Sequence, residues 1–367
     1  MILRKRSTGH HTVPAAVTAM MRDAALPGLS IAVVRDDRLL YAGAFGSADL
    51  ATGAPAATTT SYLWFSMSKI ATATAALRLA DEGRLDLDAP LDEYVGYLRA
   101  PGHAQPTTRQ LLTHTAGLAN PLPIRWVHRA GEPGTDPEAL LRRLAGRRRS
   151  FRYRVGGTAR YSNLGYLAAA QVIAAAAGRP FTDYVREAVL RPAGMTGTGY
   201  TYRPDARAAT GYVRTPRGTG PLLTAVLPKG IVGERHGRYV GLRPFLVDGA
   251  GYGGLVGDVL DAGRLLRLHL GDGQIDGRRI LGAETARAMR RIVATGRPFD
   301  HATGWFRRPV ADSTEPYVEH FGAGAGFWNV MRLYPERNLG IVVMTNSTTT
   351  YQFDPLFRQL TGVAWPD

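Results

Sequence analysis

The sequence contains no cysteine among its 367 residues. Disulfides, thiolate metal sites and cysteine-based catalysis are therefore excluded, and the redox character of the compartment is left open. Lysine is also rare, because 45 residues are Lys or Arg but only Lys5, Lys69 and Lys229 are lysines. Where arginine is the usual cation, a lysine suggests a position that needs a group able to lose its proton, which arginine cannot do.

Long apolar runs are missing as well. The nearest candidate, residues 166–177, is short and mostly alanine, so no segment is predicted to span a membrane. The basic residues within 1–14 are not followed by an apolar run, and no secretory signal is visible. We therefore expect a cytoplasmic protein with no membrane partner.

Three common enzyme signatures are absent or incomplete. There is no Gly-x-Ser-x-Gly elbow and no His-Glu-x-x-His pair, which argues against an α/β-hydrolase and a metal enzyme. Residues 249–254 fit Gly-x-Gly-x-x-Gly, but no second parallel strand with an acidic ribose partner follows at the expected distance. We expect neither a metal nor another cofactor.

The formal net charge of +15 suggests an alternative function, because basic proteins often bind nucleic acid. One segment is especially dense in arginine, and its members are Arg142, Arg143, Arg147, Arg148, Arg149, Arg152 and Arg154. Only Phe151 and Tyr153 supply aromatic rings there, and no nucleic-acid motif accompanies them. We interpret the positive charge as composition bias and predict no nucleic-acid partner.

Hydrophobic periodicity predicts strands near both ends of the chain and helices between them. Strands are expected at residues 29–34, 39–45, 327–334 and 339–345, and helices at residues 12–25, 70–79, 107–112, 138–144, 166–177, 181–190 and 258–269. The predicted fold class is α/β with an added α domain. Residues 1–65 and 250–367 would form the α/β domain, residues 66–249 a mostly helical domain, and the active site would lie at their junction.

Ser66 and Lys69 form a Ser-x-x-Lys pattern. On a helix, residues three positions apart share a face, so the Lys69 amine can lie beside the Ser66 hydroxyl. The residues that follow, 70–79, carry apolar side chains at helical spacing. Ser66 is then expected at the N-terminus of a buried helix, where free N–H groups favour a developing negative charge. The pair has the groups of an activated nucleophile, although the same pattern also occurs in ordinary solvated helix starts.

Five segments together resemble the serine β-lactamase-like and penicillin-binding-protein-like hydrolases, especially class C β-lactamases and family VIII carboxylesterases. Residues 27–34 are similar to the first strand of that family, residues 66–69 to its first motif, residues 111–118 to its signature loop and residues 161–163 to its Tyr-x-Asn motif. Residues 320–322, His-Phe-Gly, stand where the family has Lys-Thr-Gly or, in many esterases, His-x-Gly. The resemblance covers most of the chain. It implies a β-lactamase/transpeptidase-like fold, in which helices flank an antiparallel sheet and a mostly helical domain is inserted.

The resemblance also implies a role for each motif. Ser66 would form an acyl-enzyme, Tyr161 would be its base with help from Lys69, and Asn163 would hydrogen-bond Lys69 or the substrate. The adjacent ammonium is expected to stabilise the phenolate and so lower the pKa of Tyr161. The oxyanion hole is assigned to the N–H groups of Ser66 and Ala323.

Substrate binding is assigned to His320, Phe321 and Gly322. Gly322 is expected to let the backbone approach the substrate closely. The lysine and threonine that help lactamases and peptidases hold a substrate carboxylate are replaced here by His320 and Phe321. A neutral ester or amide is therefore the favoured substrate. His114, in the signature loop, is expected to be structural.

The predicted function is a serine hydrolase that acts through acyl-Ser66 on a small-molecule ester or amide. An acyltransferase, a D,D-peptidase or a weak β-lactamase would use the same machinery, and the sequence does not separate a hydrolase from an acyltransferase. A non-catalytic binding module is the alternative from another class. It is disfavoured because Ser66, Lys69 and Tyr161 occur together, and a module without chemistry has no need of all three.

Overall fold

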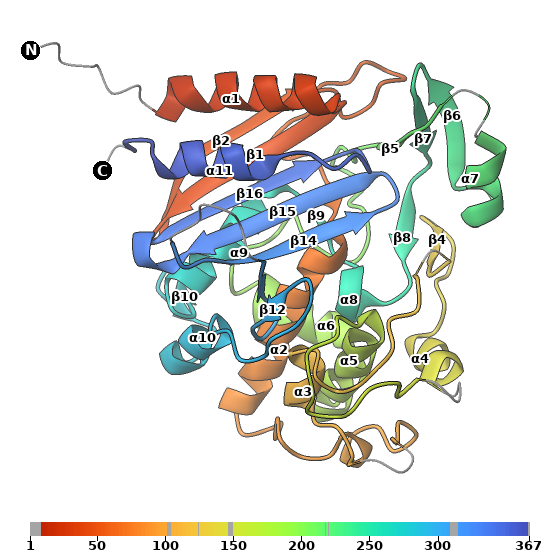
Figure 1. Cartoon of the computed structure of the whole chain (residues 1–367), viewed down its shortest axis with the longest axis vertical. Coiled ribbons are helices and arrows are strands. Elements are labelled where there is room, and N and C mark those ends of the chain that lie inside the picture. The colour runs from red at the N-terminus through yellow and green to blue at the C-terminus, as the bar shows by residue number, and fades with distance from the viewer. Residues whose placement is uncertain are drawn as a thin grey trace, which may run out of the picture.

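The computed structural model describes residues 9–100, 104–123, 125–145, 150–216, 218, 220–308 and 315–365. Strands from both ends of the chain form a seven-stranded antiparallel sheet in the order β12-β13-β14-β15-β16-β1-β2 (Figure 1). Its strands are β1 (Gly28–Arg35), β2 (Arg38–Gly46), β12 (Asp300–His301), β13 (Phe306–Arg307), β14 (Val318–Gly324), β15 (Phe327–Tyr334) and β16 (Leu339–Thr345).

The strands predicted at both ends of the chain are confirmed. The expected hairpin forms between β1 and β2, with Arg35 opposite Arg38, and Asp36 takes the left-handed backbone conformation at the turn. On its other side β1 pairs with β16 along its length, from Leu29 opposite Thr345 to Arg35 opposite Leu339. The first and last long strands are thus neighbours in the interior of the sheet.

Both faces of the sheet are buried. Alternate residues of a strand point to opposite faces, and each face packs against its own set of apolar side chains. In β1, Ile31 and Val33 pack with side chains of α1 (Gly9–Ala24) and α11 (Phe353–Thr361), which lie side by side on one face in Figure 1. Ala32 and Val34 belong to the larger core on the other face, where α9 (Val259–Leu270) packs on the sheet. Two hydrophobic cores therefore share one sheet.

The predicted helices of the middle region are present. The largest are α2 (Ser68–Asp81) and α5 (Asn163–Ala177), which are buried against each other and are accompanied by α3 (Thr108–Leu112), α4 (Pro137–Ala145), α6 (Phe181–Val185), a π-helical turn (Arg186–Leu190) and α8 (Ala250–Gly253). The capping box expected before α3 forms between Thr107 and Gln110. Gly178 ends α5 in the left-handed conformation, with φ of 65°.

Residues 66–249, predicted to be mostly helical, also contain strands that the sequence analysis did not predict. This region also contains a three-stranded sheet, β5-β7-β6, and a two-stranded pair, β4-β8. The additional elements are β4 (Val127–Arg129), β5 (Gly211–Arg214), β6 (Val232–His236), β7 (Tyr239–Leu242), β8 (Phe245–Val247) and α7 (Gly220–Val226). Each strand is only three to five residues long, so its own periodicity is too weak to identify it, and β4 and β8 also pair across a long stretch of the chain.

The other short elements are β3 (Tyr62–Leu63), β9 (Val256–Gly257), β10 (Gln274–Ile275), β11 (Arg278–Arg279) and α10 (Ala283–Met289). β3 pairs with β9 immediately before the turn that holds Ser66. Across the residues that the structure describes, no helix combines the length and the apolar character needed to cross a bilayer.

Candidate active site

Ser66 lies in a single 3-10 turn (Phe65–Met67) that leads directly into α2. The predicted position at the start of a buried helix is therefore confirmed. Phe65, the residue before the serine, has φ of 46°, in the left-handed region that a bulky side chain seldom occupies. Such strain is typical of functional turns. The Ser-x-x-Lys pattern itself gave no signal for it.

Two glycines of β14 let this strand lie directly against the serine turn. A Cβ atom at Gly322 would be 1.9 Å from the carbonyl oxygen of Trp64, and one at Gly324 would be 2.1 Å from the ring of Phe65. The close approach predicted for Gly322 is therefore made to the backbone before Ser66. On the neighbouring strand, Asn329 Nδ2 donates to the Leu63 carbonyl at 2.8 Å. These contacts fix the sheet relative to the turn.

Lys69 is completely buried, with an exposed fraction of 0%. Its Nζ lies 3.0 Å from Ser66 Oγ, 2.8 Å from Asn163 Oδ1 and 2.9 Å from the carbonyl oxygen of Tyr252. All three neighbours are uncharged oxygens. Burial without a carboxylate partner lowers the pKa of Lys69 well below its ordinary value, because the charged ammonium loses its hydration.

Tyr161 lies between the signature loop and the serine. Its ring is 4.9 Å from Lys69 Nζ and its hydroxyl hydrogen-bonds the Ser66 side chain. Burial raises the pKa of Tyr161 above its ordinary value, and the hydrogen bond with Ser66 acts in the opposite direction. The expectation that a neighbouring ammonium lowers the pKa of Tyr161 is therefore wrong, because Lys69 itself favours the neutral amine here.

Asn163 begins α5 and makes the contact with Lys69 that the motif suggested. Ser162 caps this helix by accepting a hydrogen bond from the Gly165 N–H. The Asn163 N–H donates to Asn120 Oδ1 at 3.0 Å, which ties the start of α5 to the segment just after the signature loop. The short spacing from Tyr161 to Asn163 thus places a phenol and an amide on the two sides of one amine.

Three histidines surround the Tyr161 ring, and the sequence analysis assigned only His320 to the site. The ring centre of Tyr161 is 4.6 Å from that of His114, 6.3 Å from that of His301 and 6.2 Å from that of His320. Burial lowers the pKa of all three, for His301 to about 4. They are therefore neutral at physiological pH. No local pattern links them, since they meet only in the folded chain.

The hydrogen bonds of two of these histidines define which nitrogen carries the proton. The Ser162 N–H donates to His114 Nδ1 at 3.1 Å, so His114 Nδ1 is the acceptor nitrogen. His320 Nδ1 lies 2.8 Å from the Phe321 carbonyl oxygen and must donate its hydrogen there. His320 Nε2 is left as a hydrogen-bond acceptor beside Tyr161.

Phe321 is placed away from the serine. Its ring packs against Phe353 of α11 and Trp328 of β15, in the core on the opposite face of the sheet. His320, one position earlier in the strand, faces Tyr161. Adjacent strand residues point to opposite faces of the sheet, so only one of the two can face the serine. Phe321 therefore lies outside the site.

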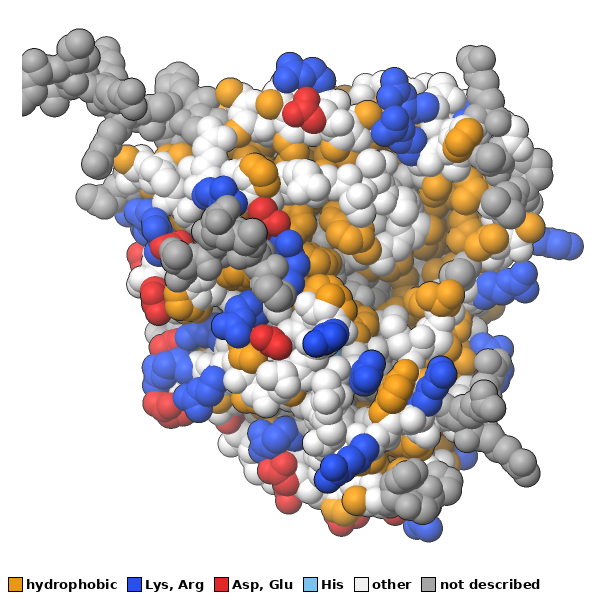
Figure 2. Space-filling view, in the orientation of Figure 1, with side chains coloured by type: hydrophobic (Ala, Val, Ile, Leu, Met, Phe, Trp, Pro, Cys, Tyr) orange, Lys and Arg blue, Asp and Glu red, His pale blue; other side chains and the backbone are white. Residues whose placement is uncertain are grey.

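A cavity of about 260 Å³ opens at Ser66. Its lining is mostly apolar and includes Ala323, the second residue assigned to the oxyanion hole, together with Phe65, Val127, Leu227, Phe245 and Tyr252. Figure 2 shows hydrophobic side chains gathered around the hollow on this face of the molecule. The cavity would accommodate an apolar group next to the serine.

Other groups considered in the sequence fall outside this site. Among the described residues, no cluster of His, Asp and Glu could hold a metal ion. Arg142 of the arginine-rich segment pairs with Glu138 at 2.6 Å and lies 3.7 Å from the centre of the Tyr97 ring. Residues 147–149 of that segment, all arginine, lie outside the described residues.

Comparison with known proteins agrees with this geometry. Protein Rv1367c of Mycobacterium tuberculosis (strain ATCC 25618 / H37Rv) is 31% identical over 290 residues, which make up 72% of this chain and 67% of the relative. The structure titled "EstCE1, a hydrolase with promiscuous acyltransferase activity" has 22% identity and a TM-score of 0.72, covering 92% of this chain and 93% of its own. D-amino acid amidase from Ochrobactrum anthropi SV3, in its complex with D-phenylalanine, has 21% identity and a TM-score of 0.77, covering 95% and 98%.

At these identities the two solved structures establish a shared fold, a β-lactamase/transpeptidase-like arrangement of an antiparallel sheet with flanking helices. The profile of the family described as Beta-lactamase matches residues 13–361, which is nearly the whole chain. The chain therefore belongs to the beta-lactamase family of serine hydrolases.

Proposed function

We propose that this protein is a serine esterase that forms an acyl-enzyme on Ser66, with small amides as a second substrate class. The observation that carries the proposal is the environment of Lys69: a wholly buried amine 3.0 Å from the Ser66 hydroxyl, surrounded by uncharged oxygens. A serine hydroxyl needs a base within hydrogen-bond reach, and Lys69 meets that distance.

The hydrogen-bond pattern of Lys69 suits a neutral amine. Asn163 Oδ1 and the Tyr252 carbonyl oxygen can only accept, so they use the two N–H groups of a neutral amine. In the structure Lys69 Nζ donates to Ser66 Oγ at 3.0 Å; in the neutral amine, the lone pair would take the place of that N–H and accept the hydrogen of the Ser66 hydroxyl. Burial lowers the pKa of Lys69, because the charged ammonium loses its hydration, and this shift favours the neutral form. Lys69 is thus the base that takes the serine proton.

The reaction then follows from the positions of these groups. The Ser66 proton moves to Lys69 as Oγ attacks the substrate carbonyl, and the tetrahedral intermediate carries its negative charge on the former carbonyl oxygen. The N–H groups of Ser66 and Ala323 would stabilise that oxygen. Tyr161 stays a neutral phenol, so it can give its proton to the leaving oxygen while it takes one from the Lys69 ammonium, and the C–O bond to the leaving group breaks.

The second half repeats these transfers with water. A water molecule gives its proton to Lys69 and attacks the acyl carbon, and the proton returns to Ser66 Oγ as the acid leaves. Two features support a neutral group next to the serine. The cavity there is mostly apolar, and neither Lys nor Arg is among the residues that line it. This favours esters with an apolar group at that position.

The test combines turnover with covalent labelling. The protein is incubated with p-nitrophenyl esters of increasing chain length, with nitrocefin and with a serine-directed phosphonate, and the adduct is located by mass spectrometry. We expect ester turnover and an adduct on Ser66. The matched control is Ser68→Ala, since Ser68 begins the same helix and only holds the Leu255 N–H. Ester turnover that persists in Ser66→Ala would refute the proposal.

A further inference from the structure

We propose that a second cavity, on the far side of Tyr161 from the apolar one, binds a carboxylate carried by the substrate at a distance from the scissile bond. This inference rests on the proposed esterase function and deepens it by naming a substrate class. The cavity holds about 470 Å³. The residues of its lining that matter here are Asn120, Arg152, Tyr153, Arg160, Tyr161 and Arg297.

The lining of this cavity carries positive charge and no carboxylate. Arg152, Arg160 and Arg297 contribute to it, while no Asp or Glu does. Many other arginines of the molecule form ion pairs with carboxylates, as Arg142 does with Glu138. Among the described residues, none of the three lining arginines forms an ion pair with a carboxylate. Their guanidinium groups therefore remain available to an anion that enters the cavity.

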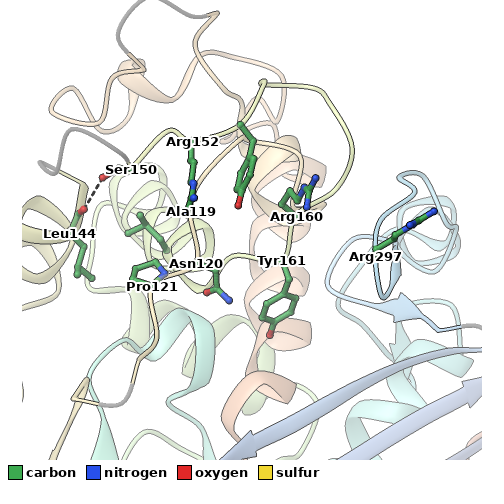
Figure 3. A pocket seen from close by; sticks show the side chains of 11 residues that line it. Ala119, Asn120, Pro121, Leu144, Ser150, Arg152, Arg160, Tyr161 and Arg297 are labelled. Atoms are coloured by element: carbon green, nitrogen blue, oxygen red, sulfur yellow. Dashed lines mark hydrogen bonds between the residues drawn. The ribbon is translucent and has the colours of Figure 1, made fainter.

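Figure 3 shows how these side chains are arranged. Arg152 and Arg160 extend from the segment above Tyr161, and the Tyr161 ring points downwards, away from them. The Asn120 side chain lies beside that ring. Arg297 stands at the far rim with its side chain directed away from the other two arginines. Arg152 and Arg160 are accordingly the principal anchors.

Tyr161 connects this cavity to the reaction centre. It lines the arginine cavity, and its hydroxyl hydrogen-bonds Ser66, which lines the apolar cavity. Asn120 also lines the arginine cavity, and its Oδ1 accepts from the N–H of Asn163, which lines the apolar one. Tyr161 and the Asn120–Asn163 contact therefore lie between the two cavities, and the proposed substrate is an extended molecule that passes Tyr161. A guanidinium presents paired N–H donors in a plane, a geometry that fits a carboxylate.

Arg160 also has a defined position. Its guanidinium carbon lies 5.0 Å from the centre of the Tyr153 ring, which also lines the cavity. A cation held against an aromatic face loses less freedom when it binds an anion than an unrestrained surface side chain does. Arg154 is exposed, as Arg160 is, but it does not line the cavity.

The carboxylate could belong to the acyl group or to the leaving group, and two series of esters distinguish these. In the first, p-nitrophenyl esters of ω-carboxy acids of increasing length are compared with their methyl-capped, neutral counterparts. In the second, acyl esters of 4-hydroxybenzoate are compared with those of methyl 4-hydroxybenzoate. We expect kcat/KM to be higher for the charged member in one of the two series, and the difference to shrink as salt is added.

Three variants identify the residues responsible. Arg152→Ala and Arg160→Ala are each expected to reduce the ratio of charged to neutral kcat/KM by about three- to tenfold, as for a partly exposed charge pair. Arg154→Ala removes a neighbouring exposed arginine of the same segment and should leave the ratio unchanged. All three variants should hydrolyse the neutral esters at the wild-type rate, which shows that the Ser66 machinery is intact.

The outcomes separate this inference from the proposed function. Suppose that neutral esters are hydrolysed through Ser66. The carboxylate site is then refuted if neither series prefers the charged member, or if the preference survives in both Arg152→Ala and Arg160→Ala. In either case the proposed esterase function stands. If no ester is hydrolysed, the esterase fails, and calorimetric titration with suberate still tests the cavity. Suberate binding that weakens in Arg160→Ala and not in Arg154→Ala supports the site, and no binding refutes it.

Discussion

Replacing Lys69 with arginine tests the assignment of the base directly. Arginine keeps the positive charge and a similar length, but it cannot give up its proton in a protein. General-base assistance typically contributes about 10²- to 10⁴-fold, so kcat/KM for a p-nitrophenyl ester should fall by that factor. The substitution also places a permanent charge at a position with 0% exposure and no carboxylate contact. The effective penalty for burying such an ion is several kcal/mol, so Lys69→Arg should also be less stable.

Two companion variants separate the loss of the base from the loss of stability. Lys69→Met has a similar length and no charge, so it should lose the same activity with a smaller loss of stability. Lys229→Arg is the matched control, because Lys229 is an exposed lysine and should behave as the wild type. The measurement is kcat/KM at 25 °C, corrected for the folded fraction by circular dichroism. Activity of Lys69→Arg within tenfold of the wild type would show that Lys69 is only a structural cation.

Three further predictions concern other parts of the molecule. Asn163→Asp places a carboxylate at the oxygen 2.8 Å from Lys69 Nζ, which should raise the pKa of Lys69. The acidic limb of the pH profile of kcat/KM should then move up by about one pH unit or more. An unmoved limb would mean that Lys69 is not the titrating base. Gly322→Ala puts a Cβ 1.9 Å from the Trp64 carbonyl oxygen, so the free energy of unfolding measured in urea should drop by about 1–3 kcal/mol. The value of kcat should fall as well, and wild-type stability would contradict the close contact. Burial and Asp258 raise the pKa of Asp261 from 3.8 to about 7, so between these pH values the folded state holds a proton that the unfolded chain releases. The free energy of unfolding should therefore decline as the pH rises, by at most about 1.4 kcal/mol per pH unit, and Asp261→Asn should lack this decline. If urea unfolding shows the same change between about pH 5 and 8 for the wild type and the variant, the prediction is refuted.

Local patterns predicted what depends on neighbours in the sequence. The contact between Ser66 and Lys69 needs only one helical turn, and it is present at 3.0 Å. The strands β1, β2, β15 and β16 and the helices α1, α2, α5 and α9 were predicted because each carries its own hydrophobic period over many residues, whereas β14 and α11 were not predicted. The strands β4 to β8 were missed because each has only three to five residues, too few to show a period of its own.

Burial and facing direction account for the other differences. The pKa of Tyr161 was expected to fall, since the sequence identified the neighbouring amine but gave no measure of how completely both groups are buried. His114 and His301 could not be placed beside Tyr161, because they belong to segments that meet only in the fold. The case of Phe321 is different. Strict alternation along β14 would have placed it on the opposite face from His320.

The pairing of β1 with β16 has a consequence for how the protein is made. Leu29 emerges from the ribosome 316 residues before Thr345, its partner across the strand pair. At about 5–20 residues per second, β1 waits roughly 15–60 seconds with one hydrogen-bonding edge unmatched and the apolar side chains of its two faces uncovered. Nascent chains of this protein are therefore expected to depend on chaperones until β16 has been synthesised.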